Sequence, residues 1–427
     1  MHALPKTEER YLEAKRELSS KVVWMGGVEG EPALVVDQTI FYPEAGGQPA
    51  DEGWLVLQTG EQIRVVGARK MENSIVLLLD KKDKERIPNI GEQITQRIDW
   101  DLRMGHVRHH SACHLLLPVF QEILGEIRPH GAGLSEEKAR IDFEVEGKIS
   151  SGDLKRIENR AYELILENRP MISQFLPREE AETRYGIDQL YWSEPPPPEA
   201  TTIRVTQIEG MPAYACGGTH VSSTAEIGLI KFISRSRLEG GVDRIELVAG
   251  ASAFKLVQQQ LKALEKTSRV FESGLLDVPT FANRLKLRIK TLDKELKDTK
   301  SKLLKYKTDD FLKTAEPIGQ YKLFVAELDD YPLPDLENLV KSLVEKDPNL
   351  VALAGSAAEK AMLAGATGEN VPDVGLLDAI REATSLLGGG AGGGPTFARG
   401  GGPKRDKLKD ALKHAKAAFI NQLRQKE

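Results

Sequence analysis

The spacing of the histidines gives the first indication of chemistry in this sequence. Within a stretch of helical periodicity, nine consecutive residues contain four of the eight histidines, namely His106, His109, His110 and His114. His110 and His114 are four residues apart, so one helical turn places both imidazoles on one face, about 5 to 6 Å apart. At that separation two ring nitrogens can converge on one metal ion. Because His106 extends the same face, the spacing alone does not decide which pair would bind.

A second cluster adds sulfur to this set. Cys216 and His220 are also four residues apart, on a Cys-Gly-Gly-Thr-His turn that can wrap around an ion. Together with two histidines of the helix, they supply the four nitrogen and sulfur ligands of a tetrahedral zinc site. Calcium and magnesium would require carboxylates instead. Cys113 lies about 100° round the helix from His114, so it is left out of the expected ligand set.

The segments around these residues predict a mixture of strands and helices. Between residues 20 and 98, five short β-branched or apolar runs alternate with turn residues, which predicts a small β-barrel. Helical spacing at 104–124 and 151–168, with a strand between them at 140–145, predicts an α/β arrangement around the candidate ligands.

Two connecting segments carry weaker patterns. Residues 8–19 are polar and predict a short helix ahead of the first strand. Four prolines at 195–198 cannot continue a helix or a strand, so we expect them to bridge to a further strand at 202–207.

The second half of the chain begins with two runs of heptad spacing within 251–308. A glycine and proline break at 274–279 separates the runs and predicts an antiparallel helical hairpin. Alternating strand and helix patterns over 309–427 predict a small α/β domain. We therefore expect a multidomain α+β protein, with a barrel at 1–98 and an α/β domain at 99–250 ahead of these two parts.

Composition narrows the class of protein. The 59 basic and 64 acidic side chains give a net charge of −5, within an ordinary globular composition. No apolar run approaches the roughly 18 residues of a membrane span, and two cysteines are too few for a disulfide framework, which favours a reducing cytosol. The charge is nevertheless uneven. Residues 251–308 carry +8 and residues 404–427 carry +5, a distribution that predicts contact with a polyanion.

Several motifs follow one another in the order of a known family. The three most specific are Thr-Ile-Phe-Tyr-Pro-Glu-Ala-Gly-Gly-Gln-Pro-Ala-Asp-Glu-Gly over residues 39–53, His110-Ser-Ala-Cys-His114 and Cys216-Gly-Gly-Thr-His220. They resemble the motifs of the editing domain of alanyl-tRNA synthetases and of the free-standing AlaX proteins. The heptad runs followed by glycine-rich residues 388–402 are similar to the synthetase's C-terminal domain of the DHH-associated type.

The resemblance implies a function. It indicates a free-standing, cytoplasmic editing factor of the long AlaX type, acting in trans on tRNA(Ala) that carries a wrong amino acid. The reaction would be hydrolysis of the aminoacyl ester, chiefly of seryl-tRNA(Ala) and alternatively of glycyl-tRNA(Ala). A zinc ion would be held by the four residues His110, His114, Cys216 and His220. A catalytic zinc normally keeps an open position, so one ligand would be displaced or the ion would become five-coordinate.

The resemblance also implies roles for single residues. Thr39 would face the seryl hydroxyl, and Gln48 would lie beside the scissile ester. Gly46 and Gly47 would supply positive-φ turns and close backbone approach to the aminoacyl group. Ala45 stands where the family has the first of three glycines, and a positive φ there would strain it. In the C-terminal domain, a glycine-rich loop would present three side chains to tRNA phosphates: Arg399, Lys404 and Arg405.

Other interpretations remain open from the sequence. The chain could be the C-terminal editing part of a longer alanyl-tRNA synthetase, or a tRNA-binding protein that keeps the editing fold without catalysis. An unrelated zinc peptidase fits poorly, because its HExxH pattern would place glutamate where Ser111 stands. Heptad residues left exposed by the hairpin would allow a homodimer, through either the hairpin or the C-terminal domain.

Overall fold

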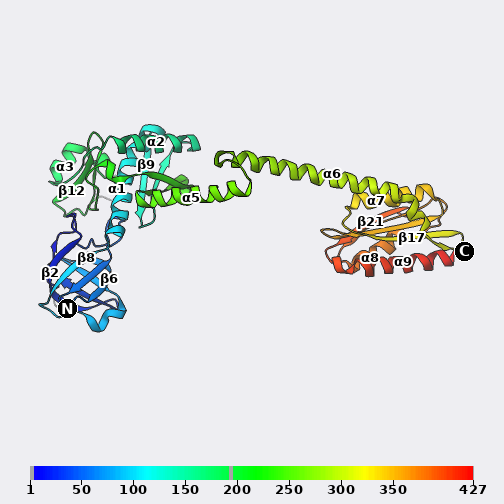
Figure 1. Ribbon diagram of the computed structural model, residues 1–427, viewed down its shortest axis with the longest axis horizontal. Coiled ribbons are helices and arrows are strands. Elements are labelled where there is room, and N and C mark those ends of the chain that lie inside the picture. The colour runs from blue at the N-terminus through cyan, green and yellow to red at the C-terminus, as the bar shows by residue number, and fades with distance from the viewer. Residues whose placement is uncertain (1–3, 192–195, 427) are drawn as a thin grey trace. The chain divides into compact units, whose positions relative to one another are not determined.

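The computed structural model describes residues 4–191 and 196–426. It shows a mixed α+β protein with several sheets, divided into two compact units that meet in sequence between Thr267 and Ser268 (Figure 1). The first unit contains every candidate metal ligand, and the second contains the glycine-rich C-terminal segment. None of the helices in the described ranges combines the length and the apolarity that a membrane crossing demands.

The first unit begins with six strands in which every strand pairs with two others, in the closed order β2-β3-β7-β6-β5-β8. Their bounds are β2 Glu17–Val28, β3 Glu31–Val36, β5 Gly53–Leu57, β6 Gln62–Met71, β7 Ser74–Leu79 and β8 Gln93–Ile98. Apolar side chains such as Leu34, Ile63 and Leu77 are fully buried inside this barrel. The glycine-rich loop 40–52 leaves the barrel between its second and third strands and reaches the candidate metal ligands.

The predicted helix at 8–19 is wrong. The segment forms the two-residue strand β1 (Glu8–Glu9), followed by turns, and pairs in parallel with β4 (Gln38–Thr39). The amide groups of Glu8 and Arg10 donate to the carbonyls of Asp37 and Thr39. The segment lacks an apolar helical face, so neighbouring strand carbonyls satisfy its backbone donors better than an isolated helix would.

The central helix α1 (Trp100–Leu124) positions half of the candidate site. Asp99 caps its N-terminus by accepting from the amide of Leu102, and the helix ends before Gly125, whose φ is 86°. Fourteen of its 25 residues are buried, because it packs against both α2 (Ser151–Leu166) and a four-stranded sheet. That sheet has the order β14-β15-β10-β9, with bounds β9 Ile127–Leu134, β10 Ala139–Val145, β14 Ile230–Arg237 and β15 Val242–Ala249.

A smaller sheet completes the first unit and carries the second ligand cluster. Its antiparallel order is β11-β12-β13, with bounds β11 Met171–Pro177, β12 Thr202–Ile208 and β13 Ala213–Ala215. The Cys216–His220 segment follows its last strand directly. Two short helices, α3 (Arg178–Tyr185) and α4 (Ile187–Leu190), connect its first two strands. Of the four prolines at 195–198, Pro195 lies outside the described residues, and Arg178 donates to the carbonyls of the other three.

The second unit is built on a six-stranded sheet of order β16-β17-β18-β19-β21-β20. Its strands are β16 Glu316–Ile318, β17 Tyr321–Leu328, β18 Leu350–Ala357, β19 Ala361–Thr367, β20 Gly390–Gly393 and β21 Phe397–Gly402. Helices α8 (Leu376–Leu386) and α9 (Leu408–Gln425) pack on one face, and α7 (Leu333–Lys346) packs on the other (Figure 1).

The glycine-rich segment at 388–402 is not the loop that the resemblance suggested. It forms strands β20 and β21, which pair with each other, and β21 also pairs with β19. Close packing of these strands excludes larger residues, since a Cβ on Gly400 would lie 2.5 Å from the carbonyl oxygen of Gly390. The glycines therefore continue a sheet at this position.

The two heptad runs form the helices α5 (Ala251–Val270) and α6 (Val278–Lys313), separated by the predicted break. Pro279 occupies the first turn of α6, where its missing N–H costs no helical hydrogen bond. Most of α5 belongs to the first unit and α6 to the second. The antiparallel pairing of these helices therefore stays a prediction, as do the boundaries of the four domains.

Candidate metal centre

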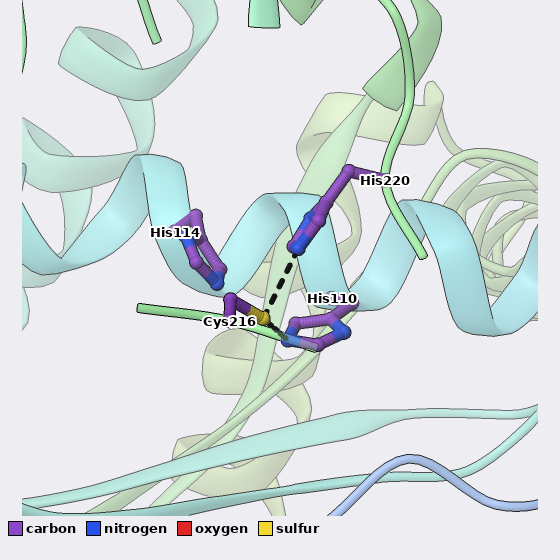
Figure 2. Close-up of side chains that lie close together, drawn as sticks. All are labelled: His110, His114, Cys216 and His220. Atoms are coloured by element: carbon purple, nitrogen blue, oxygen red, sulfur yellow. Dashed lines mark hydrogen bonds between the residues drawn. The ribbon is translucent and has the colours of Figure 1, made fainter. Parts of the chain in front are cut away.

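The four expected ligand residues converge in the structure. One ligating atom from each of His110, His114, Cys216 and His220 lies within 4.8 Å of the other three. Figure 2 shows the Cys216 sulfur between the imidazoles of His110 and His220, with Sγ–Nε2 distances of 3.3 and 3.2 Å. His106 and Cys113 are not members of this group. Of the three candidate histidines on α1, the fold therefore brings His110 and His114 to the metal group and leaves out His106.

Gln48 determines how His110 presents its ring. The backbone N–H of Thr219 donates to Gln48 Oε1 at 3.0 Å, and Gln48 Nε2 donates to the Thr219 hydroxyl at 2.8 Å. These contacts fix the amide orientation, because a backbone N–H can only donate. His110 Nδ1, which is 3.0 Å from the same Oε1, must therefore carry the proton and donate it. The lone pair then lies on Nε2, the atom that faces Cys216.

Ser111 provides the matching contact for His220. Its hydroxyl donates to the carbonyl of Val107 at 2.8 Å and accepts from the amide of Val221 at 3.1 Å. The hydroxyl has only one proton, so His220 Nδ1, 3.4 Å away, can only donate to it. Nε2 of His220 is thereby left as the metal-facing nitrogen.

The remaining imidazole fits a metal ligand for a different reason. Both ring nitrogens of His114 are buried, and neither has a hydrogen-bond partner within the described ranges. Buried polar nitrogens are rarely left without a partner, and a metal ion would satisfy one of these two. Three observations show that the residues fit a zinc ion. The ring nitrogens of His114 lack partners, the ligating atoms lie close together, and Gln48 and Ser111 leave Nε2 of His110 and of His220 free to bind.

Burial sets the protonation of the ligand set. It lowers the pKa of His110 to about 3 and the pKa values of His114 and His220 well below their ordinary value, so all three imidazoles are neutral. Burial also raises the pKa of the Cys216 thiol to about 11, although the Gly218 amide and the Arg204 charge oppose that shift. Neutral imidazoles are the form that binds a metal, and a coordinating thiol loses its proton to the ion.

The two glycines of the Cys-Gly-Gly-Thr-His turn have different roles. A Cβ on Gly218 would collide with the imidazole of His110 and would lie 2.9 Å from Gln48 Oε1. A Cβ on Gly217 would meet no atom within 4 Å. Close approach to His110 therefore requires glycine at the second position only.

A cavity of about 1200 Å³ adjoins the metal group through His110. Gly46 and Gly47 line it, and their φ angles of 57° and 76° agree with the expected positive-φ turns. Ala45 is not among the positive-φ residues of the described chain, so it carries no such strain. Arg128, Tyr191 and Tyr214 also line the cavity. This volume exceeds that of most small-molecule sites.

Comparisons with known proteins find three family models that match parts of this chain. Models described as "Threonyl and Alanyl tRNA synthetase second additional domain", "tRNA synthetases class II (A)" and "DHHA1 domain" match residues 203–246, 12–102 and 320–421. The alanine–tRNA ligases of Methanobrevibacter smithii and Pyrococcus abyssi are each 33% identical, over 93% and 96% of this chain. The chain resembles the editing and C-terminal domains of alanyl-tRNA synthetase.

The chain covers less than half the length of each of these ligases. The chain spans 44% of the Methanobrevibacter ligase and 43% of the Pyrococcus ligase. A solved structure, the C-Ala domain from Aquifex aeolicus alanyl-tRNA synthetase, aligns at 24% identity with a TM-score of 0.23. That alignment covers 25% of this chain and 98% of the C-Ala chain.

Thr39 is not a member of the metal group. Its side chain is fully buried in the barrel, where the hydroxyl donates to Gln96 Oε1 at 2.6 Å and accepts from the amide of Phe41 at 3.1 Å. Thr39 is not among the residues that line the cavity. A seryl hydroxyl would have to compete with Gln96 for the Thr39 proton, so recognition of serine by Thr39 stays a prediction.

The buried hydroxyl of Thr39 leads to a stability prediction. We expect Thr39→Val to lower the free energy of unfolding by about 1–3 kcal/mol, because Gln96 Oε1 loses its donor while it remains buried. Urea denaturation measures the change, and Thr39→Ser, which keeps the hydroxyl, is the control. A Thr39→Val variant as stable as the parent would show that this hydrogen bond contributes nothing.

The three expected phosphate-binding residues lie in the second unit, on the DHHA1-like domain. Arg399 in β21 forms an ion pair with Glu337, and Arg405 donates to the carbonyl of Ala357 at 2.9 Å. Both side chains and that of Lys404 are exposed. Because they belong to a different unit from the metal group, their contact with a shared tRNA stays a proposal.

Sequence reasoning missed three residues that hold the ligand set in place. Ser111 contacts His220, Arg204 contacts Cys216, and Thr219 acts through Gln48. Ser111 and Thr219 are each adjacent to a ligand, and polar neighbours of metal ligands commonly hold those ligands in place. That rule could have singled them out. Arg204 is 12 residues from Cys216 and carried no local signal in the sequence.

Proposed function

We propose that this chain is a zinc-dependent hydrolase that deacylates mischarged tRNA(Ala), chiefly seryl-tRNA(Ala), with glycyl-tRNA(Ala) as a second candidate substrate. The observation that carries the proposal is the convergence of four nitrogen and sulfur ligands beside a cavity that the glycine-rich loop 40–52 helps to form. The matches to alanine–tRNA ligases support the substrate, since the matched region of this chain includes both ligand clusters.

The proposed reaction adds water to the acyl carbon of the ester and releases the amino acid and the ribose hydroxyl of the terminal adenosine. When bound, zinc supplies Lewis-acid polarisation and lowers the pKa of water. Gly46 and Gly47, which carry no side chain, let the aminoacyl group approach the backbone at the cavity wall. His110 belongs both to the cavity wall and to the ligand set, and the contact with Gln48 holds its ring in place.

Proton transfer in this reaction has no single obvious base. Glu126 and Asp188 are the carboxylates that line the cavity among the described residues. The ribose hydroxyl of the substrate itself is a third candidate. Replacing Glu126 or Asp188 would slow hydrolysis if that carboxylate is the base. If the ribose hydroxyl is the base, neither replacement would remove it.

We also propose that the second unit binds the tRNA body. The helix α6 presents a series of basic residues. Arg399 lies in β21, the neighbour of the edge strand β20, and Lys404 and Arg405 follow shortly after β21 in the sequence. Phosphates dominate RNA affinity through such cations, which makes binding sensitive to salt. As part of the same proposal, heptad side chains that the predicted hairpin leaves exposed would allow a homodimer in the cytoplasm.

Two alternatives predict different behaviour. Because the chain spans less than half of its ligase relatives, it could be the editing portion of a longer synthetase, acting in cis on the same substrate. A tRNA-binding protein without catalysis would bind tRNA(Ala) but would not hydrolyse its ester. The complete metal ligand set and the buried Gln48 contacts favour the hydrolase.

One assay tests the proposed substrate and the role of the second unit together. Hydrolysis of seryl-, glycyl- and alanyl-tRNA(Ala) is measured for the zinc-loaded full chain and for a chain ending at Thr267. We expect seryl-tRNA(Ala) to be cleaved at least about 100-fold faster than alanyl-tRNA(Ala). The shortened chain should show a higher KM that no longer rises with salt. Parental KM and salt dependence in the shortened chain would remove tRNA binding from the second unit.

A further inference from the structure

Arg204 holds the turn that carries half of the metal ligands. It lies in β12, the strand that pairs with β13 just ahead of Cys216. Its Nη1 donates to the carbonyl of Cys216 at 2.9 Å and to the carbonyl of Gly218 at 2.5 Å. Its own carbonyl accepts from the amide of Cys216 at 2.9 Å. One residue therefore restrains the turn at three points, two of them through its side chain.

The surroundings of this guanidinium are unusual for a structural arginine. It is partly buried. Among the residues that the structure describes, the acidic groups facing it are the Cys216 thiol and the phenols of Tyr42 and Tyr11. Those groups are neutral when protonated, so none of them balances the charge as a carboxylate would.

A metal-bound Cys216 changes that balance. Cysteine binds zinc as a thiolate, which would place a negative charge next to the guanidinium. The same geometry then serves two purposes, since the two carbonyl contacts orient the turn and the positive charge stabilises its sulfur ligand. Outer contacts of this kind typically contribute 10- to 100-fold to metal affinity.

We propose that Arg204 is a positioning residue for the metal centre, which holds the 216–220 turn so that the Cys216 sulfur and the His220 imidazole face the two histidines of α1. This inference rests on the zinc site of the proposed function and does not depend on the substrate. It predicts that Arg204 acts on metal affinity and on coordination geometry, and only through them on hydrolysis.

The test measures zinc affinity of the full chain by competition with a chelator, in the absence of tRNA. Arg204→Met keeps the aliphatic bulk and removes the donors and the charge, whereas Arg204→Lys keeps the charge without the guanidinium fork. Thr202→Ala, at an exposed position on the same strand, is the matched control. We expect Arg204→Met to bind zinc about 10- to 100-fold more weakly, Arg204→Lys to be intermediate and Thr202→Ala to match the parent.

A second readout separates positioning from a general effect on folding. In the cobalt-substituted parent we expect the visible spectrum of a tetrahedral site with a sulfur-to-metal charge-transfer band, and we expect that band to weaken in Arg204→Met. The thermal midpoint of the metal-free protein should stay near the parental value. Parental zinc affinity and an unchanged cobalt spectrum in Arg204→Met would overturn the proposal, as would a metal-free midpoint that falls with the affinity.

The outcomes distinguish this inference from the proposed function. If the parent binds zinc with the expected dependence on Arg204 but hydrolyses no aminoacyl-tRNA, the proposed function fails and the role of Arg204 stands. If the parent hydrolyses seryl-tRNA(Ala) while Arg204→Met keeps parental zinc affinity, the role of Arg204 fails and the proposed function stands. A parent that binds no zinc overturns both.

Discussion

Replacing Gly218 with alanine is expected to weaken zinc binding by about 100-fold or more, whereas the same replacement at Gly217 should leave it near the parental value. The added methyl of Gly218→Ala would occupy the space of the His110 imidazole and press on Gln48 Oε1. His110 would then have to move, because the turn is held from the other side by Arg204. Loss of one ligand from the set opens the site and reduces both affinity and hydrolysis.

The two adjacent glycines make this a matched comparison. A methyl at Gly217 meets no atom within 4 Å, and neither glycine has a positive φ that would penalise alanine by itself. Chelator competition gives the zinc affinity of each variant, and circular dichroism shows whether each is folded. Equal zinc affinity in the two alanine variants would contradict the placement of His110 against the turn.

Removing the carboxylate of Asp51 is expected to give the largest loss of stability, about 3–5 kcal/mol in the free energy of unfolding for Asp51→Ala. Asp51 and Arg103 form an ion pair in which the side chains are only 1% and 3% exposed. Asp51 also accepts from the amide of Tyr42 at 2.7 Å, and Arg103 donates to the carbonyl of Ile40 at 2.7 Å. The pair therefore ties both ends of the glycine-rich loop to α1, and its loss leaves a buried guanidinium without its counter-charge.

Urea denaturation of Asp51→Ala measures this cost, and two variants provide the comparison. Asp310→Ala breaks the exposed pair with Lys313 and should change the free energy of unfolding by less than about 0.5 kcal/mol. The double variant Asp51→Ala/Arg103→Met should recover part of the loss, because it removes the unpaired charge as well. A loss below about 1 kcal/mol for Asp51→Ala alone would show that the loop is held by other contacts.

The parts of the fold and site that the sequence could predict depend on local periodicity. Helical spacing placed His110 and His114 on one face of a helix, and the structure contains that helix as α1. The same periodicity could not exclude His106, which lies on that face but is not part of the metal group. Which two of these histidines join the metal group depends on where the 216–220 turn lies. The pairing of β12 with β13, which are far from α1 in sequence, sets that position.

Side-chain partners were the less predictable part, because they join distant segments. The resemblance places Gln48 beside the scissile ester, which stays a prediction, and the structure shows its contacts with Thr219, 171 residues away, and with His110. The hydroxyl of Thr39 is engaged by Gln96, a residue that no motif singled out. The polar segment at 8–19 was assigned a helix from its local pattern, whereas its backbone pairs with β4. In each case the structure depends on a contact with a residue distant in sequence, which local propensity does not reveal.

The most direct test of the account is seryl-tRNA(Ala) hydrolysis by one preparation of the full chain, measured before zinc removal, after chelation and dialysis, and after zinc is restored. We expect the rate to fall to that of the uncatalysed ester without zinc and to return when one equivalent of zinc per chain is added. Circular dichroism of the zinc-free sample checks that the chain is still folded. A folded, zinc-free sample that hydrolyses seryl-tRNA(Ala) at the full rate would contradict it.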